Sequence, residues 1–435
     1  MNACDKSLAS GPGHAIGTDD RPVTPVSDSV APVSGEQGGR SVEARLLSRL
    51  LERLGKPALE FVLWTGERVS TGVTEPVARV TITNRATLFG ILADPQVGFG
   101  DAYSEGRITI EGDLVRMLET VYQAGAGKPR QSSTLRRALD LLHHRPRSNS
   151  LVGSRDNIHH HYDIGNAFYS LWLGNTMAYT CAYYPTPSAT LDEAQRAKMD
   201  HVCRKLRLNA EESVVEAGCG WGTLALHMAR HYGVRVRAFN ISHEQIVYAR
   251  ERAKREGLDS RVEYVEDDYR NISGRYDAFV SVGMLEHVGP ENYPTLGRIV
   301  HETLDSRGRG LIHSIGCNRP MPLNPWIEKR IFPGAQPPSL GEMMRIFEPW
   351  GLSVLDVENL RLHYAQTLRH WLDLYEGARD RVGELFDERF VRMWRLYLSG
   401  SIAAFTTGSL QLFQVLFAPH DNNNIAWTRE HLYSR

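Results

Sequence analysis

The stretch Glu212–Gly233, ESVVEAGCGWGTLALHMARHYG, decides the fold predicted for this chain. An apolar run typical of a buried strand leads into the glycine-rich turn Glu216–Gly222 (EAGCGWG), and a helical pattern follows directly. Glycines allow such a turn to tighten and allow backbone N–H groups to approach a ligand closely. The turn alone is weak evidence, because it could serve a dinucleotide, a nucleotide or no ligand at all.

Four more strands are predicted downstream, with helical patterns between them. They lie in VRVRAFNIS (234–242), VEYVEDD (262–268), YDAFVSVGMLEHVG (276–289) and GRGLIHSIG (308–316). Strands that alternate with helices predict a parallel, doubly wound α/β sheet. We therefore expect one large α/β domain over residues 157–435.

A smaller α+β domain is predicted over residues 41–125. Leucines at positions 46, 47, 50, 51 and 54 form a helical stripe, strands are expected at 58–64 and 77–82, and FGDAYSEGRITIEGDL (99–114) indicates a helix, a turn, a short strand and another helix. Residues 1–40 are rich in Ser, Pro, Gly and Asp, which predicts a disordered tail.

A basic linker is expected at residues 126–156, which contain seven Lys or Arg and only two Asp. It is interpreted either as a solvated connection or as an arm that meets anionic lipid headgroups, each cation contributing about 1 kcal/mol.

The composition of the whole chain narrows the classes of function. Its 435 residues carry a formal net charge of -1, so no global basic field indicates nucleic-acid binding. The five cysteines are widely spaced and form no CxxC motif, which argues against a disulfide framework or a metal site and fits a reducing cytoplasm. No N-terminal apolar stretch resembles a signal peptide.

The longest uncharged run is 396–419, which is too polar for a membrane span. Its apolar residues Phe405, Leu412, Phe413, Leu416 and Phe417 recur at helical spacing, which predicts a helix. Two interpretations stay open together: a buried core helix, and a helix whose apolar face lines a lipid pocket.

The spacing within the glycine-rich turn is more specific than the turn itself. Its ExGxGxG pattern resembles class I methyltransferases, whose turn holds the amino acid end of S-adenosylmethionine. The resemblance implies a Rossmann-like sheet with helical insertions. In place of the acid that this class often puts on the ribose hydroxyls, the second strand ends in Asn240, with Gln245 nearby. Asp267 or Asp268 is the candidate for the adenine amino group, and Tyr269 for packing on the ring. The predicted cofactor residues are Tyr179, Thr180, Glu216, Gly218, Gly220, Asn240, Ile241, Gln245, Asp267, Asp268 and Tyr269.

Five further segments resemble the cyclopropane fatty acid synthase family, in the family's order. They are HHYDIGNAFYSLWLGNTMAYTCAYY (160–184), VGMLEHVGPENY (282–293), IHSIG (312–316), PWIEKRIFPG (325–334) and HYAQTLRHW (363–371). The resemblance runs from about residue 157 to the C-terminus, and the smaller N-terminal domain is similar to that of the phospholipid-acting bacterial members. It implies methyl transfer from S-adenosylmethionine to the double bond of an unsaturated phospholipid acyl chain, followed by ring closure.

In that family a bound bicarbonate ion is thought to remove the proton that closes the ring. The resemblance assigns backbone donors to Cys181 and Ile315, side-chain donors to His313 and Tyr364, and an acceptor that could also orient His313 to Glu286. Each residue has an ordinary alternative: a small buried Cys, a packed core His or Tyr, or a helix-capping Glu. Thr180 stands where the family usually has serine and keeps the hydroxyl.

The resemblance also implies partners. It suggests a cytoplasmic homodimer that docks peripherally on the inner face of the membrane, with no nucleic acid and no metal. The rival hypotheses are a methyl-branching or methylene-forming enzyme or an N-methyltransferase on the same scaffold, and a non-catalytic lipid-binding protein that keeps the fold. A nucleic-acid methyltransferase is disfavoured by the neutral charge.

Overall fold

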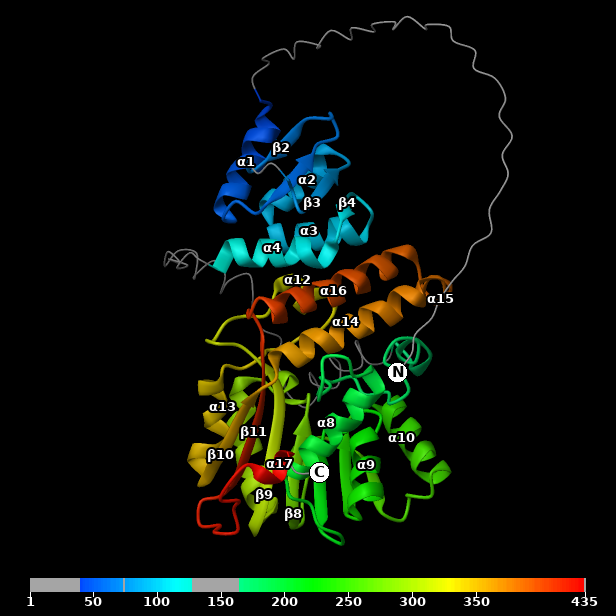
Figure 1. The fold of residues 1–435 in the computed structure, drawn as a ribbon, viewed down its shortest axis with the longest axis vertical. Helices are drawn as coiled ribbons and strands as arrows, with labels where there is room; N and C mark the ends of the chain where they lie inside the picture. Colours follow the sequence, from blue (N-terminus) through cyan, green and yellow to red (C-terminus); the bar gives the residue numbers. More distant parts are fainter. Residues whose placement is uncertain (1–39, 73–74, 127–163, 434–435) are drawn as a thin grey trace, which may run out of the picture. The chain divides into compact units, whose positions relative to one another are not determined.

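A computed structural model of the chain describes residues 40–72, 75–126 and 164–433 (Figure 1). The predicted tail at 1–40 and the predicted basic linker at 126–156 lie almost entirely outside this part.

The N-terminal elements surround a four-stranded sheet of order β2-β1-β3-β4, in which β1 and β3 are parallel and the other pairs antiparallel. The leucine stripe forms a helix as predicted, and the strand β2 was not predicted. The elements are α1 (Val42–Arg53), β1 (Leu59–Val62), β2 (Arg68–Ser70), β3 (Ala78–Ile82), α2 (Arg85–Ala93), α3 (Pro95–Ser104), β4 (Ile108–Gly112) and α4 (Leu114–Ala126).

The larger sheet has seven strands in the order β10-β11-β9-β8-β5-β6-β7. All five predicted strands are present and mutually parallel, which confirms the doubly wound α/β prediction. Two strands at one edge were not predicted, and β11 runs antiparallel to both of its neighbours. The strands are β5 (Ser213–Ala217), β6 (Arg235–Asn240), β7 (Val262–Glu266), β8 (Tyr276–Val282), β9 (Leu304–Gly316), β10 (Leu352–Asn359) and β11 (Gln411–Pro419).

The helical prediction for 396–419 is wrong in its second half. The helix α16 (Glu388–Thr406) ends before Gly408, whose φ of 80° breaks the helix, and the chain continues as β11. Because β11 lies inside the sheet, nearly all its side chains are buried on both faces. A strand of this kind shows no polar alternation, so its apolar run cannot be told from a buried helix by periodicity.

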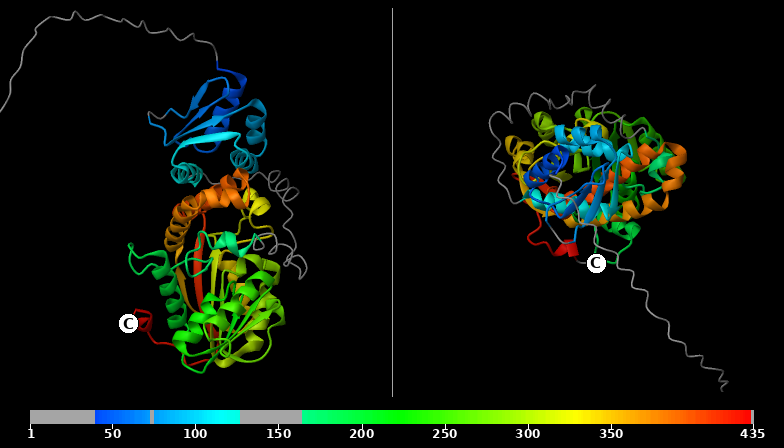
Figure 2. Two further views of the ribbon diagram at one scale, coloured as in Figure 1. Left: turned by 90° about the vertical axis from the view of Figure 1, so that its right-hand side faces the viewer. Right: turned by 90° about the horizontal axis from the view of Figure 1, so that it is seen from above.

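Helices cover both faces of the larger sheet (Figures 1 and 2). Val214 of β5 packs with α8, α9 and α10, whereas its neighbour Val215 packs with α11 and α13, as alternating strand side chains require. The helices and short turns are α7 (Asn166–Tyr169), α8 (Leu191–Lys205), α9 (Thr223–Tyr232), α10 (His243–Arg255), η1 (Tyr269–Asn271), η2 (Leu285–His287), η3 (Pro290–Asn292), α11 (Tyr293–Thr303), α12 (Pro325–Arg330), α13 (Leu340–Phe347), η4 (Glu348–Trp350), α14 (Arg361–Gly377), α15 (Arg379–Leu385) and α17 (Glu430–Tyr433).

Two long helices, α14 and α16, lie side by side across the end of the sheet where the parallel strands finish (Figure 1). A hydrophobic cluster joins them to the N-terminal elements. Arg392 of α16 donates to the carbonyls of Tyr103 and Ile108, and Arg330 of α12 pairs with Asp101 of α3. The carboxyl end of the sheet is therefore roofed by packed helices.

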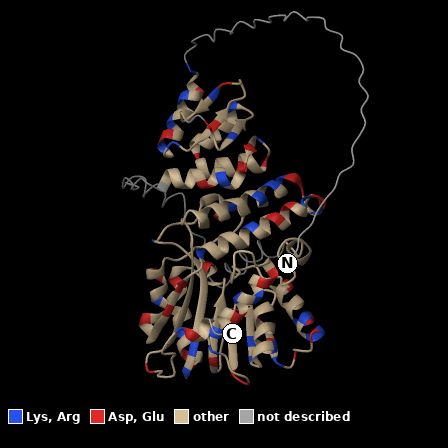
Figure 3. Cartoon of the chain, in the orientation of Figure 1, with Lys and Arg blue, Asp and Glu red and all other residues tan. Residues whose placement is uncertain are grey.

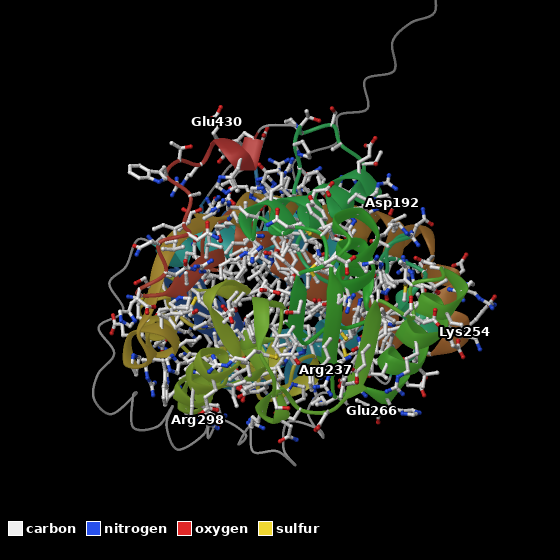
Figure 4. All side chains as sticks on the ribbon, turned by 90° about the horizontal axis from the view of Figure 1, so that it is seen from below. Asp192, Arg237, Lys254, Glu266, Arg298 and Glu430 are labelled. Atoms are coloured by element: carbon white, nitrogen blue, oxygen red, sulfur yellow. The ribbon has the colours of Figure 1, made fainter. Side chains whose placement is uncertain are left out.

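Charged residues of both signs are interspersed along the described helices (Figure 3). Seen from below, the labelled residues Lys254, Arg298 and Glu430 lie toward the edge of the ribbon (Figure 4). Few charged side chains of the described residues are buried, and those of the active site belong to this minority.

Candidate active site

The glycine-rich turn has the geometry that its pattern predicted. Gly218, Gly220 and Gly222 all have positive φ, at 83°, 54° and 78°. A Cβ at Gly218 would lie 2.8 Å from Met284 and one at Gly222 would lie 2.3 Å from the Tyr264 hydroxyl, whereas one at Gly220 would meet nothing within 4 Å. The turn is therefore closed on its protein side and open at Gly220, which fits a ligand that contacts the backbone.

The ends of β6 and β7 bring the predicted ribose and adenine residues to the same edge. Asn240 Nδ2 donates to Gln245 Oε1 over 2.7 Å, and half-buried Ile241 follows β6. The Asn240 carbonyl accepts from the Asp267 N–H. These side chains lie near one another and beside the turn, since Asn240 also reaches the Gly220 carbonyl at 3.5 Å.

The two candidate acids differ in their surroundings. Asp268 is buried and accepts from the backbone N–H and the guanidinium of Arg270, which also lies 5.0 Å from the ring centroid of Tyr269. Asp267 is half-buried and accepts from Asn271. Burial raises the pKa of Tyr269 to about 12. Both acids stay candidates, and Asp267 is the more accessible one.

The segment Tyr179–Cys181 is clamped from two sides. Gln195 of α8 donates to the Thr180 carbonyl over 2.9 Å, and Lys198 donates to the Thr180 hydroxyl over 2.8 Å. From the opposite side, Thr367 of α14 accepts from the Ala182 N–H at 3.0 Å. The segment is thereby fixed between two helices that are far apart in the sequence.

Glu216, near the end of β5, is a buried carboxyl group whose pKa the buried Lys198 influences. Burial raises its pKa to about 8, and the charge of Lys198 opposes that rise. Burial likewise lowers the pKa of Lys198 to about 8. Within the described residues, Glu216 Oε2 has no hydrogen-bond partner. The sequence analysis did not identify Lys198.

Glu286, in η2 after β8, is a second buried carboxylate. Its Oε1 accepts from the Ile315 N–H over 2.5 Å, and its carbonyl accepts from the Gln336 N–H over 2.7 Å. Burial raises the pKa of Glu286 to about 7, with the Ile315 N–H acting in the opposite direction. The expected backbone donor at Ile315 is thus already used by Glu286, and Oε2 has no partner among the described residues.

His313 lies two residues before Ile315, so both point to the same face of β9. Its Nδ1 lies 3.0 Å from Gln414 Nε2 of β11, so Gln414 and not Glu286 orients the ring. Burial lowers the pKa of His313 well below its usual range, which keeps the ring neutral. In this orientation of the Gln414 amide, Nδ1 accepts and Nε2 carries the proton. Among the described residues, Nε2 has no partner.

The remaining predicted residues converge around Leu360. Cys181 Sγ lies 4.0 Å from the Leu360 carbonyl, which also accepts from the Tyr364 N–H at the start of α14. The Leu360 N–H donates to Leu412, whose partner in the sheet is Ile315. Cys181, Tyr364, Ile315, His313 and Glu286 therefore come together at the ends of β8, β9 and β11. Burial raises the pKa of the Cys181 thiol, which keeps it protonated.

Aromatic side chains close the site toward α14 and α16. The Tyr179 and Tyr397 hydroxyls lie 2.8 Å apart, and the Tyr179 ring lies 5.2 Å from Trp172 and 5.4 Å from Trp371. The Tyr364 ring lies 4.6 Å from Phe405. The site is therefore lined mainly by aromatic rings on this side, with the paired Tyr179 and Tyr397 hydroxyls among them.

Comparison with known proteins identifies the family. A family model described as mycolic acid cyclopropane synthetase matches residues 150–415, more than half of the chain. The chain belongs to this family. A second model, described only as a domain of unknown function, matches residues 46–133.

Relatives of this family cover most of the chain. It is 37% identical to a probable fatty acid methyltransferase of Pseudomonas putida, over 86% of this chain and 96% of that protein. It is 38% identical to the cyclopropane-fatty-acyl-phospholipid synthase of Escherichia coli K12, over 62% of this chain and 69% of that protein. The crystal structure of mycolic acid cyclopropane synthase CmaA1 complexed with SAH and CTAB aligns with a TM-score of 0.58 at 27% identity, covering 60% of this chain and 97% of that one.

These relationships establish the class of enzyme. The protein is an S-adenosylmethionine-dependent methyltransferase of the cyclopropane synthase family, with the class I fold that the glycine-rich turn predicted. It is a cyclopropane fatty acid synthase or a related lipid methyltransferase. The open side of the turn at Gly220 and the buried, unsatisfied Glu216 oxygen fit the methyl donor.

Proposed function

We propose that this enzyme is a cyclopropane-fatty-acyl-phospholipid synthase that uses bicarbonate as its base. The observation that carries the proposal is one buried donor and one buried acceptor left unsatisfied at adjacent strand ends. These are His313 Nε2 and Glu286 Oε2. Buried polar atoms are normally paired, so the pair indicates a small polar ligand.

Bicarbonate has the matching chemistry. Its oxygens accept hydrogen bonds and its hydroxyl donates one, so it can accept from His313 and donate to an ionised Glu286. In the proposal, the Cys181 N–H and the Tyr364 hydroxyl supply the other donors. The Ile315 N–H holds Glu286 in place and does not contact the ion, which revises the role implied by the family resemblance.

The chain itself must position the acyl double bond and exclude water. When bound, S-adenosylmethionine supplies an electrophilic methyl group. In the proposal it is held by the turn at Gly218 and Gly220, by Glu216, and by the residues at the ends of β6 and β7. The aromatic rings around Tyr179 keep the site dry, and their faces stabilise positive charge that develops on the acyl chain. His313 carries its proton on Nε2 while its Nδ1 accepts from Gln414, and Cys181 is a protonated thiol, so neither offers a free nucleophile to the developing cation.

A second candidate is formation of a methyl-branched or methylene fatty acid. The observation that favours it is the match to the probable fatty acid methyltransferase of Pseudomonas putida, which extends over 86% of the chain and so includes N-terminal residues. The N-terminal region therefore does not discriminate ring formation from branching. Ring closure and methylene formation each remove one proton from the new methyl group, whereas branching keeps all three hydrogens and needs a hydride from a separate reductant.

The proposal also includes peripheral contact of a homodimer with the inner face of the membrane. A phospholipid acyl chain has to be taken from a bilayer, and the apolar site suits it. In the described part of the chain, none of the helices combines the length and apolar character needed to cross a bilayer.

The test is mass spectrometry of acyl chains after incubation with S-adenosylmethionine and vesicles of dioleoyl phosphatidylethanolamine and dioleoyl phosphatidylglycerol, with and without bicarbonate. Cyclopropane formation adds CH2 and gives a product that resists hydrogenation. A reducible product of the same mass would indicate a methylene group, and a gain of CH4 in a parallel incubation with a nicotinamide hydride donor would indicate branching. Activity unchanged by strict removal of bicarbonate would overturn the proposed base.

A further inference from the structure

One face of α8 is both buried and polar, and the site described above does not account for it. Gln195, Lys198, His201 and Lys205 lie on this face, and each has at most 3% of its surface exposed. His201 and Lys205 both pair with Glu358 of β10 at 2.7 Å. Gln195 and Lys198 instead face the segment 178–181, which leads into the active site.

Lys198 has an unusual environment for an ammonium group. Its one hydrogen bond to a described residue goes to Thr180 Oγ1. The charge of the buried Glu216, on the strand β5 that leads into the glycine-rich turn, raises the pKa of Lys198 against the effect of burial. A buried lysine is costly unless it is paired or does specific work. Lys198 thus bonds the segment at Thr180, and its charge also acts on Glu216 of β5, the strand that leads into the glycine-rich turn.

The bond from Lys198 fixes which way the Thr180 hydroxyl can donate. An ammonium group only donates, so Thr180 Oγ1 must be the acceptor. The hydroxyl hydrogen of Thr180 then points elsewhere, and no described residue accepts it. On the other side, the Thr180 methyl group lies 2.8 Å from the position that a Cβ at Gly283 would take, so the glycine leaves room for this side chain.

We propose that Lys198 is a positioning residue for the methyl donor: it holds the Thr180 hydroxyl so that this group donates to the carboxylate at the amino acid end of the donor. Gln195 supports the same arrangement by holding the Thr180 carbonyl. This inference deepens the donor site of the proposed function and does not depend on which lipid product forms.

The test uses two ligands that differ in the amino acid end. S-adenosylhomocysteine carries it, whereas 5′-methylthioadenosine keeps the adenosine and sulfur but lacks the carboxylate. Calorimetry on Lys198→Met should show S-adenosylhomocysteine binding about tenfold weaker, with less than a twofold change for methylthioadenosine. Equal weakening of both ligands would mean a merely structural role and would overturn the inference.

A double-mutant cycle tests whether Lys198 acts through Thr180. Thr180→Val should reproduce the selective loss, and the Lys198→Met/Thr180→Val variant should be no weaker than either single variant. Thr180→Ser should bind like the wild type, because it keeps the hydroxyl. Additive losses, or a Thr180→Val variant with wild-type ligand selectivity, would overturn the proposal.

Thr180→Val is nearly isosteric, so it decides the question even if Lys198→Met fails to fold. The assay contains no lipid and no bicarbonate. A failure of the proposed cyclopropane chemistry would therefore leave these binding results unchanged, and the two proposals can fail separately.

Discussion

Two buried carboxyl groups on neighbouring parts of the sheet both have a raised pKa but differ in what opposes the rise. For Glu216, on the side of the glycine-rich turn, the charge of the buried Lys198 opposes the rise in pKa that burial causes. Glu286, at the ends of β8 and β9, has no cation among the causes of its shifted pKa and is held by a backbone N–H. Burial raises the pKa of both carboxyl groups, but the charge of a lysine opposes this rise only for Glu216, whereas hydrogen bonds alone oppose it for Glu286; we therefore assign the first region to ligand binding and the second to proton transfer.

Replacing Glu286 should have the largest effect and tests whether the two regions have separate roles. We expect Glu286→Ala to lower the rate of lipid methylation by about 10³-fold, because an active-site acceptor and the group that occupies the Ile315 N–H are lost together. The measurement is single-turnover methyl transfer from labelled donor into phospholipid vesicles. Affinity for S-adenosylhomocysteine should stay within twofold of the wild type, because Glu286 is assigned to the other region. A large loss of that affinity would show that the two regions are not separable.

Glu286 should be needed for activity but should lower the stability of the folded protein at high pH. The folded-state pKa of Glu286 is about 7, above the 4.5 of an ordinary glutamate, so the folded protein holds this proton more tightly than the unfolded chain does. Stability is lost as pH rises from about 4.5 through 7. Glu286→Gln cannot ionise and should raise the free energy of unfolding by up to about 3 kcal/mol at pH 8.

Urea unfolding at pH 5 and pH 8 measures this effect, with little difference expected at pH 5. Glu216→Gln is the parallel variant: burial raises the pKa of Glu216 as well, so this variant should also gain stability at pH 8 relative to pH 5. A Glu286→Gln variant with wild-type stability at both pH values contradicts the prediction.

Gln414 is the residue that orients His313 in the same region as Glu286, and its role can be tested separately. Gln414→Leu removes the group that fixes His313 Nδ1, so the ring can adopt the other tautomer and lose its Nε2 donor. We expect about a tenfold fall in kcat with donor affinity unchanged. The control is Gln411→Leu, on the opposite face of the same strand, where the side chain bonds Asn359 and the Gly408 carbonyl. Equal effects of the two variants would mean that Gln414 only stabilises β11.

The sequence predicted the region of the glycine-rich turn well. The pattern from Glu216 to Gly222 carries its own geometry, because three positive φ values within five residues favour glycine at fixed spacing. The five parallel strands follow from the same alternation of strands and helices. The family motifs likewise selected Glu286, His313 and Tyr364, which the fold brings to neighbouring strand ends.

The supporting residues could not be predicted, because they depend on long-range packing. Lys198 and Gln195 lie on a helix with acidic and basic residues at many positions, which by sequence resembles a solvated face. Only the contact with segment 178–181 shows that they are buried. Gln414 was hidden by the incorrect helical prediction for 396–419, and a residue on a helix there would not have been placed opposite His313.

The smallest expected effect concerns Asn240, which replaces the acid common in the wider methyltransferase class. Its amide bonds Gln245, and two neutral groups hold a ribose less strongly than a carboxylate does. We expect Asn240→Ala to weaken the binding of S-adenosylhomocysteine by about fivefold. The value of kcat should stay unchanged, because the substitution weakens the binding of the methyl donor and of the transition state equally. Calorimetry with methylthioadenosine should show the same fivefold loss, since that ligand keeps the ribose. This shared loss is the opposite of the selective loss expected at Lys198, so the two ligands together separate the ribose end of the donor site from its amino acid end.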